Sequence, residues 1–267
     1  MKVEQKRVIA IEGIDGVGKE SVANATTAVL NESGFMAEKV SFPRYDTPIG
    51  NICERYLKKE FGHPVYLEPF IASAPYVLDR IQYFLQNTAL LSSWDFLILD
   101  RSYYTNFIHQ GSKFDNMHEL AVWMIAQYKS ELKMTRLKDN FFEVYFLSLS
   151  EEARRKQISI REELDGLESD TYYQQRCVDF IKYTQSELFS YNLWSALKDI
   201  NQETYYKFLC RFYIDCVKFI TVTHVDDSSK IPEANRADAT VIANLATRNL
   251  GISPKEYKYI DRPLIKG

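Results

Sequence analysis

The chain has 267 residues, of which 46% are hydrophobic, and a formal net charge of −3 from 33 basic and 36 acidic residues. This length and composition fit one large α/β domain with a sizeable core, and the balanced charge argues against a nucleic-acid or membrane-surface binder. No membrane span, signal peptide, Cys-x-x-Cys pair or histidine cluster is visible, so we expect a cytoplasmic single domain over residues 1–267 with four reduced cysteines and no zinc.

Runs of β-forming residues alternate with helical patterns along the chain. We predict strands over residues 7–12, 35–42, 96–100, 142–149 and 219–224. We predict helices over residues 19–33, 48–60, 69–91, 117–132, 151–158, 170–188 and 236–250. Strands separated by helices form a parallel sheet. The expected fold class is therefore α/β, a five-stranded parallel sheet with helices on both faces.

A glycine-rich loop, Gly13-x-x-Gly16-x-Gly18-Lys19, follows the first predicted strand and leads into a helix. Glycines let backbone N–H groups point at phosphate oxygens, and the helix N-terminus favours the same anion. Lys19 can reach the β- and γ-phosphates. Strand, loop, lysine and helix in this order predict an ATP site and a P-loop NTPase-type fold. The strand context argues against the alternative, a plain glycine turn.

The position after Lys19 departs from the phosphate-loop pattern, which has Ser or Thr there as a ligand of Mg²⁺. This chain has Glu20 at that position, and Ser21 follows one residue later. A carboxylate can bind Mg²⁺, although it repels a triphosphate. Three alternatives stay open: Glu20 holds the metal, Ser21 substitutes for it, or catalysis has been lost. The other phosphoryl-transfer residues favour retained activity.

Two further segments place charged residues at the ends of strands. An apolar strand ends in Asp100 and Arg101, and Arg44 lies in a loop after the second strand. Because ligands bind at the carboxyl ends of parallel strands, Asp100 could take Mg²⁺ and both arginines could clamp phosphates. The alternative for Arg101 is that it only neutralises Asp100. The alternative for Arg44 is a solvent-exposed loop arginine.

The helix predicted at 69–91 carries Tyr76 and Arg80 four residues apart, on one face. A ring beside a guanidinium suits a nucleoside monophosphate, whose base stacks and whose phosphate pairs. The alternative is a half-buried Tyr76 on a surface pair of Asp79 and Arg80. The charged stretch 154–168 could be a lid that closes over the transferred phosphoryl group, or a solvated helix surface.

Taken in order, these segments resemble the thymidylate kinase family of P-loop nucleoside-monophosphate kinases, from residue 7 to about 188 and again through 250. The phosphate loop, Phe42-Pro-Arg44, Asp79-Arg80, Asp100-Arg101-Ser102 and the stretch 161–168 carry the resemblance. It implies a kinase that uses ATP and Mg²⁺ to phosphorylate a deoxynucleoside monophosphate, dTMP to dTDP, for dTTP synthesis. It also implies a homodimer.

The residues and the resemblance together assign the site. The expected catalytic residues are Asp15, Lys19, Arg101 and Arg161, the last in the lid. The expected ATP-binding residues are Gly13, Gly16, Gly18, Lys19, Glu20 and Ser21. The expected substrate-binding residues are Asp15, Phe42, Arg44, Tyr76, Arg80, Asp100, Arg101, Thr105 and Gln110. The expected ligands of Mg²⁺ are Glu20, Ser21 and Asp100.

Some features depart from the family pattern. Ser102 replaces a tyrosine, and His109 replaces a ring that helps to reject ribose. Gly16 stands where one subgroup carries an arginine, so the catalytic cation would come from the lid. Residues 191–218, which look helical, resemble an insertion, and residues 252–267 resemble a C-terminal arm.

Two other functions stay open. A deoxynucleoside kinase would need a carboxylate base near the 5′-hydroxyl group, and Asp100 could supply it. The arginines expected to bind the acceptor, Arg44, Arg80 and Arg101, favour a monophosphate substrate, because a neutral nucleoside has no phosphate for them to bind. A non-catalytic nucleotide-binding or scaffold protein would be consistent with Glu20, with residues 191–218 as its partner surface.

Overall fold

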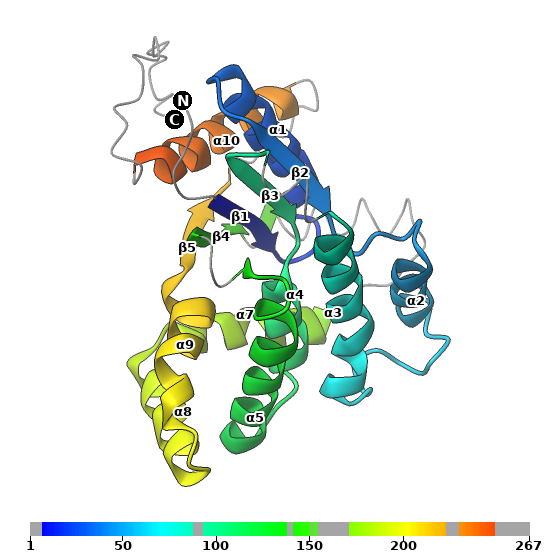
Figure 1. Cartoon of the computed structure of the whole chain (residues 1–267), viewed down its shortest axis with the longest axis vertical. Coiled ribbons are helices and arrows are strands. Elements are labelled where there is room, and N and C mark those ends of the chain that lie inside the picture. The colour runs from blue at the N-terminus through cyan, green and yellow to red at the C-terminus, as the bar shows by residue number, and fades with distance from the viewer. Residues whose placement is uncertain are drawn as a thin grey trace.

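A computed structural model describes residues 7–87, 93–137, 141–150, 152–153, 171–222 and 230–248. Its five strands form one parallel sheet in the order β2-β3-β1-β4-β5 (Figure 1). They are β1 (Arg7–Gly13), β2 (Ala37–Ser41), β3 (Phe96–Asp100), β4 (Phe141–Ser148) and β5 (Val217–Thr221). The predicted five-stranded parallel α/β fold is confirmed, with strand ends that differ by a few residues.

Helices connect the strands. The α-helices are α1 (Lys19–Glu32), α2 (Pro48–Leu57), α3 (Pro69–Gln86), α4 (Tyr103–Gly111), α5 (Met117–Gln127), α7 (Thr171–Thr184), α8 (Glu187–Asp199), α9 (Tyr206–Cys210) and α10 (Ile231–Arg248). The described residues also form two π-helical turns, η2 (Tyr128–Leu132) and η5 (Arg211–Asp215), and a 3₁₀ turn, η4 (Glu203–Tyr205). None of the described helices is both long and apolar enough to cross a membrane.

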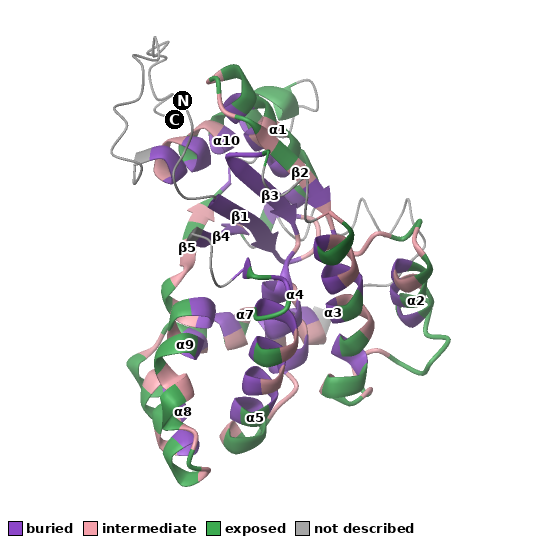
Figure 2. Ribbon diagram, in the orientation of Figure 1, coloured by how far each residue is buried: buried purple, intermediate pink, exposed green. Residues whose placement is uncertain are grey.

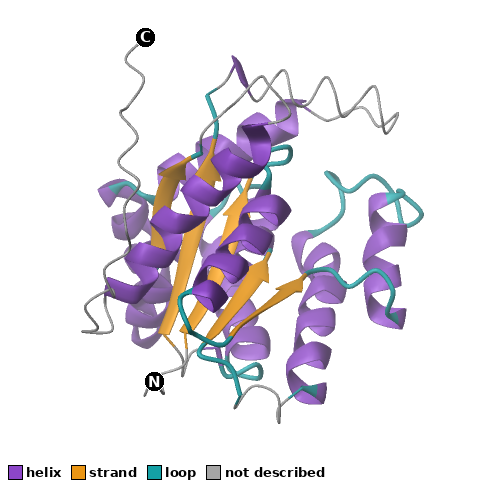
Figure 3. Cartoon of the chain, turned by 90° about the horizontal axis from the view of Figure 1, so that it is seen from above, coloured by secondary structure: helices purple, strands orange, loops and turns teal. Residues whose placement is uncertain are grey.

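Both faces of the central strands β1 and β3 are buried, whereas the outer strands β2 and β5 are partly exposed (Figure 2). Side chains alternate along β1: Val8 faces a core that α4, α5, α7 and α8 complete, whereas Ile9 faces a core that α1 and α10 complete. Figure 3 shows helices on both sides of the strands. A strand that is covered on both faces is typically apolar, and β3 is buried at all five residues.

Helix α4 was not predicted from the sequence. Its Tyr, Thr and Asn residues have weak helix propensity. Ser102 caps the helix, because its Oγ accepts a hydrogen bond from the Tyr104 N–H at 3.1 Å. Tyr104 and Phe107 are 0% exposed. Tertiary burial therefore outweighs the weak local preference.

The segment 191–218 runs from α8 through η4, α9 and η5 into β5. Leu193, Leu197 and Leu209 are each 0% exposed and belong to the same core as α4 and α5. Strand β5 begins at Val217, so the end of this predicted helical segment is strand. The segment thus supplies part of the core as well as surface.

Candidate functional site

Three loops leave the carboxyl ends of neighbouring strands at one edge of the sheet. The register pairs Asp100 of β3 with Ile11 of β1 and with Ser41 of β2. The Asp100 carboxylate also accepts a hydrogen bond from the Ser41 hydroxyl at 3.1 Å. The parallel sheet therefore brings the glycine loop, the Arg44 loop and the turn after β3 together.

The glycine loop has the backbone that an anion site requires. Gly16 and Gly18 have φ angles of 82° and 81°, in the left-handed region that favours glycine. A Cβ on Gly13 would lie 2.7 Å from the Leu147 carbonyl oxygen. No side chain in the described part of the chain caps the N-terminus of α1. Its first N–H groups and the positive end of its dipole are therefore available to phosphate oxygens.

Asp15, Lys19 and Arg101 form a charged cluster beside this loop. Arg101 Nη2 donates to Asp15 Oδ1 at 3.0 Å, and Lys19 Nζ lies 3.7 Å from the same oxygen. Lys19 Nζ also donates to the carbonyl oxygens of Gly13 at 3.0 Å and Ile14 at 2.9 Å. The ion-pair partner of Arg101 in the described structure is thus Asp15, and not Asp100 as the alternative expected. Two cations around one carboxylate form a site suited to phosphate.

Burial and the neighbouring charges set the ionisation of this cluster. Burial and Arg101 lower the pKa of Lys19 to about 8, although Asp15 opposes them. Burial would raise the pKa of Asp15, but Lys19 and Arg101 outweigh it and hold that pKa well below its usual range. At neutral pH the cluster therefore holds an ionised carboxylate and two cations.

Arg101 has an unusual backbone conformation, with φ of 69°. A non-glycine residue in the left-handed region is strained, and such residues concentrate at functional sites. The Arg101 N–H donates to the Ile11 carbonyl oxygen at 3.2 Å. This turn lets the chain leave β3 and enter α4 while the Arg101 side chain reaches Asp15.

Glu12 is an organising residue that the sequence analysis did not assign to the site. It is 1% exposed and accepts hydrogen bonds from the Ser102 N–H at 2.6 Å, the Ser102 hydroxyl at 2.7 Å and the Thr105 hydroxyl at 2.7 Å. Burial raises the pKa of Glu12. Glu12 thereby joins the glycine loop to the turn after β3, and Thr105 is bound to it. The sequence feature that could have identified Glu12 is an acidic residue near the carboxyl end of an otherwise apolar strand.

Arg44 is held in place by Asp79. The Arg44 N–H and Nε donate to the two carboxylate oxygens of Asp79 at 2.8 and 3.0 Å, and Arg44 Nη2 donates to Gln82 Oε1 at 2.9 Å. The guanidinium also lies over the Tyr83 ring, 5.4 Å from its centroid. The Arg44 side chain is only 15% exposed, so it is not the freely solvated loop arginine of the alternative.

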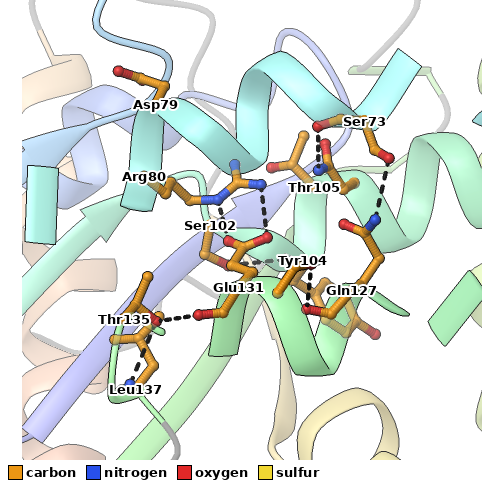
Figure 4. Close-up of polar contacts among 12 residues, drawn as sticks. Ser73, Asp79, Arg80, Ser102, Tyr104, Thr105, Gln127, Glu131, Thr135 and Leu137 are labelled. Carbon is orange, nitrogen blue, oxygen red and sulfur yellow. Dashed lines mark hydrogen bonds and ion pairs between the residues drawn. The ribbon is translucent and has the colours of Figure 1, made fainter. Parts of the chain in front are cut away.

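Arg80, which we expected to bind an acceptor phosphate, pairs with a buried carboxylate in the described structure. Its Nε and Nη2 both donate to the Glu131 carboxylate, the second at 3.1 Å. Arg80 is 1% exposed and Glu131 is 0% exposed. Figure 4 shows the guanidinium pointing from α3 to Glu131, away from Asp79. The surface pair of Asp79 and Arg80, weighed as an alternative, is wrong because both residues are buried with other partners.

The remaining predicted substrate residues lie in an aromatic region. Tyr76 is partly buried, and its ring meets the Tyr56 ring edge-on with centroids 5.9 Å apart. Phe42 is 3% exposed and packs edge-on against Tyr83, so it belongs to the core. Gln110 is 4% exposed, and its Oε1 has no hydrogen-bond partner among the described residues.

His109 lies on α4 near the charged cluster. Its Nδ1 is 3.7 Å from Cys177 Sγ, and its carbonyl oxygen accepts a hydrogen bond from the Tyr173 hydroxyl. Burial lowers the pKa of His109 to about 4, although Asp15 opposes this. His109 is therefore neutral at physiological pH.

This pKa predicts a pH-dependent stability. Between pH 6.5 and 4 the unfolded state binds a proton at His109 that the folded state does not, so the free energy of unfolding falls as the pH is lowered. His109→Asn should remove about 2 to 3 kcal/mol of the loss seen between pH 7 and 4.5. Denaturant unfolding of both proteins across this range measures the difference. Parallel pH profiles would contradict the prediction.

The predicted ligands of Mg²⁺ do not form a closed protein site. The described residues contain no group of three or more His, Cys, Asp or Glu side chains that could hold a metal ion. Ser21 is exposed, and the 75% exposed side chain of Glu20 lies 3.9 Å from Lys39 Nζ. Asp100 is 8% exposed at the edge of the crevice. Mg²⁺ commonly takes one or two carboxylates plus substrate phosphates, and Asp100 fits that arrangement better than Glu20.

The predicted lid, residues 154–168, lies outside the described residues together with Arg161. Of the expected catalytic residues, Asp15, Lys19 and Arg101 are brought together, as the distances above show.

A protein-family model described as thymidylate kinase matches residues 11–190, more than half of the chain. The thymidylate kinase of Mycobacterium tuberculosis (strain H37Rv) is 26% identical over 131 residues, which cover 49% of this chain and 59% of that protein. A probable thymidylate kinase of Methanothermobacter thermautotrophicus is 30% identical over 105 residues, covering 39% and 52%. The chain thus spans little more than half the length of these relatives.

Among solved structures, a thymidylate kinase from Candida albicans is 18% identical and covers 93% of this chain and 94% of that chain, with a TM-score of 0.49.

Proposed function

Since the chain belongs to the thymidylate kinase family, we propose that it transfers the γ-phosphoryl group of ATP to a deoxynucleoside monophosphate, dTMP to dTDP, for dTTP synthesis. One observation carries this proposal: the cluster of Asp15, Lys19 and Arg101 lies where the glycine loop meets the turn after β3. Backbone N–H donors and two cations at one edge suit a site that must hold several phosphates.

In this reaction an oxygen of the acceptor phosphate attacks the γ-phosphorus, and the bond from that phosphorus to the β-phosphate oxygen breaks to release ADP. Lys19 would exchange its two loop carbonyls for the β- and γ-phosphates. Arg101 and Arg44 would bind the acceptor phosphate, with Arg44 held by Asp79. Mg²⁺ bound near Asp100 would offset the charge of the phosphates. Positioning and electrostatics suffice, so no covalent intermediate is needed.

The test is ADP release from Mg-ATP with dTMP, dUMP, dCMP, dGMP, dAMP, UMP and thymidine as acceptors. Turnover with dTMP, alone or with dUMP, would support the proposal and show that Glu20 is tolerated. Turnover with another monophosphate would support the proposed mechanism but would identify a base other than thymine. Turnover with thymidine only would favour a nucleoside kinase, and ATP binding without any turnover would favour a non-catalytic protein.

We further propose that the chain forms a homodimer through α3. Ile71, Leu78 and Leu85 follow one another at seven-residue intervals and are 66%, 52% and 57% exposed. Residues seven apart share one face of a helix, so these side chains form an apolar stripe. Such a stripe is stable when a second helix covers it.

The double variant Leu78→Glu, Leu85→Glu should convert the dimer to monomer, because the new carboxylates would be buried without partners. Sedimentation equilibrium of the wild type and the variant measures this. Val241→Glu is the matched control, since Val241 is 48% exposed on α10 and should leave the dimer intact. A monomeric wild type, or a variant that remains dimeric, would rule out this interface.

A further inference from the structure

A cavity of about 580 Å³ lies between η2 and the segment that contains η4, α9 and η5. None of the residues that line it was assigned to the phosphate site. Ligand pockets in proteins usually measure about 300 to 1,000 Å³, so a molecule of nucleotide size fits this volume.

Two π-helical turns supply much of the lining. η2 begins at Tyr128, whose carbonyl oxygen accepts the Lys133 N–H at 3.1 Å, and η5 begins at Arg211. A π turn widens a helix by one residue and occurs frequently at functional sites. In η2, Tyr128 lines the cavity, whereas Glu131 does not line it and binds Arg80 (Figure 4).

Three basic side chains give the cavity a positive charge. Lys129, Lys133 and Arg211 line it, and no Asp or Glu is among its lining residues. Within the described part of the chain, none of these three side chains forms an ion pair, and Glu131 is already bound to Arg80. Three uncompensated cations around one hollow attract a polyanion such as a chain of phosphates.

The same cavity has aromatic walls. The rings of Tyr128 and Phe208 stack, with centroids 5.6 Å apart and planes at 29°. Tyr205 lies edge-on to Tyr128, and Lys129 Nζ lies 4.9 Å from the Tyr205 ring centroid. Phe208 is 47% exposed. An exposed ring on a packed aromatic base offers a stacking surface to a planar ligand.

We propose that this cavity is a second nucleotide-binding site, separate from the phosphate loop. The phosphates bind Lys129, Lys133 and Arg211, and the base stacks on Phe208. A ligand with both a phosphate chain and a planar ring accounts for both parts of the lining, whereas an inorganic anion or a nucleoside accounts for one. The site goes beyond the proposed kinase reaction and does not depend on it.

Equilibrium dialysis with labelled dTTP and labelled ATP tests this site. One equivalent per chain of an adenosine–deoxythymidine pentaphosphate is first added, so that it fills both nucleotide positions of the reaction crevice and none remains for the cavity. The wild type should then bind one further nucleotide per chain. Lys129→Glu with Arg211→Glu should weaken this binding at least about tenfold, because two attractive charges become repulsive. Lys207→Glu is the matched control, since Lys207 is exposed on α9 and does not line the cavity.

Competition experiments measure the contributions of the basic and the aromatic lining residues separately. Tripolyphosphate and thymidine should each displace the bound nucleotide more weakly than unlabelled nucleotide does. Failure of both nucleotides to bind the filled enzyme, unchanged affinity in the double variant, or equal competition by tripolyphosphate would overturn the proposal. Lys133→Glu provides a second variant if the double variant is shown by thermal unfolding not to fold. The Lys129→Glu, Arg211→Glu double variant and its Lys207→Glu control differ only in whether they change the cavity lining, so the difference between them reports on the cavity even if the kinase assay fails.

Discussion

Replacing Lys19 by alanine should lower turnover by about 10² to 10³-fold or more while the fold survives. Lys19 is 6% exposed, and its Nζ contacts only the loop carbonyls and Asp15 in the described structure. The variant loses a buried cation directed at the transferred phosphate, where preorganised charge has its largest effect. Steady-state ADP release with saturating ATP and acceptor measures the loss.

The matched control is Lys39→Ala. Lys39 lies on β2 and pairs with the exposed Glu20, at 3.9 Å, outside the charged cluster. We expect this variant to keep most of its turnover, because the Glu20 carboxylate is 75% exposed and solvent screens a long ion pair of this kind. Thermal unfolding of both variants verifies that the fold is retained. Near-normal turnover in Lys19→Ala would refute the proposed mechanism.

Replacing Glu131 by alanine should lower the free energy of unfolding by about 3 to 5 kcal/mol. Glu131 is 0% exposed and holds both Nε and Nη2 of the buried Arg80. Without the carboxylate, a guanidinium would remain in the core without a partner, and its desolvation would not be offset. Denaturant unfolding of the wild type and the variant measures the change.

The double variant Arg80→Met, Glu131→Leu should recover most of this loss, because apolar side chains of similar size can replace a buried ion pair. Arg236→Ala is the control, since Arg236 pairs with Glu32 on the surface and should leave stability unchanged within error. If Glu131→Ala lowers the free energy of unfolding by less than about 1 kcal/mol, the buried pair of Arg80 and Glu131 does not stabilise the fold as predicted. A raised KM for dTMP in a stable double variant would instead place Arg80 at the substrate.

The elements that the sequence predicted correctly depend on local patterns. The glycine loop followed an apolar strand, and its conformation follows from glycines that tolerate a left-handed backbone. Alternation of strands and helices implied a parallel sheet, which places the loops after β1, β2 and β3 at one edge. The convergence of Asp15, Lys19 and Arg101 could therefore be predicted before any contact was known.

The interaction partners of the buried charged residues could not be predicted from the sequence. Arg80 and Glu131 are 51 residues apart, Arg44 and Asp79 are 35 apart, and Glu12 and Ser102 are 90 apart. A charged residue read from sequence has many candidate partners at such separations. Which one it meets depends on how α3, η2 and α4 pack, because a buried charge must find an opposite charge or donor within reach.

By itself, the sequence determined the phosphate loop, the parallel sheet and the edge at which the site lies, since short-range backbone preferences and hydrophobic patterns decide these. Only the tertiary structure decided that Arg80 is committed to Glu131, that Glu12 joins two loops, and that the basic and aromatic residues of η2 and η5 meet around one cavity. Those outcomes come from long-range packing, in which burial makes each polar group take the partner that the fold brings to it.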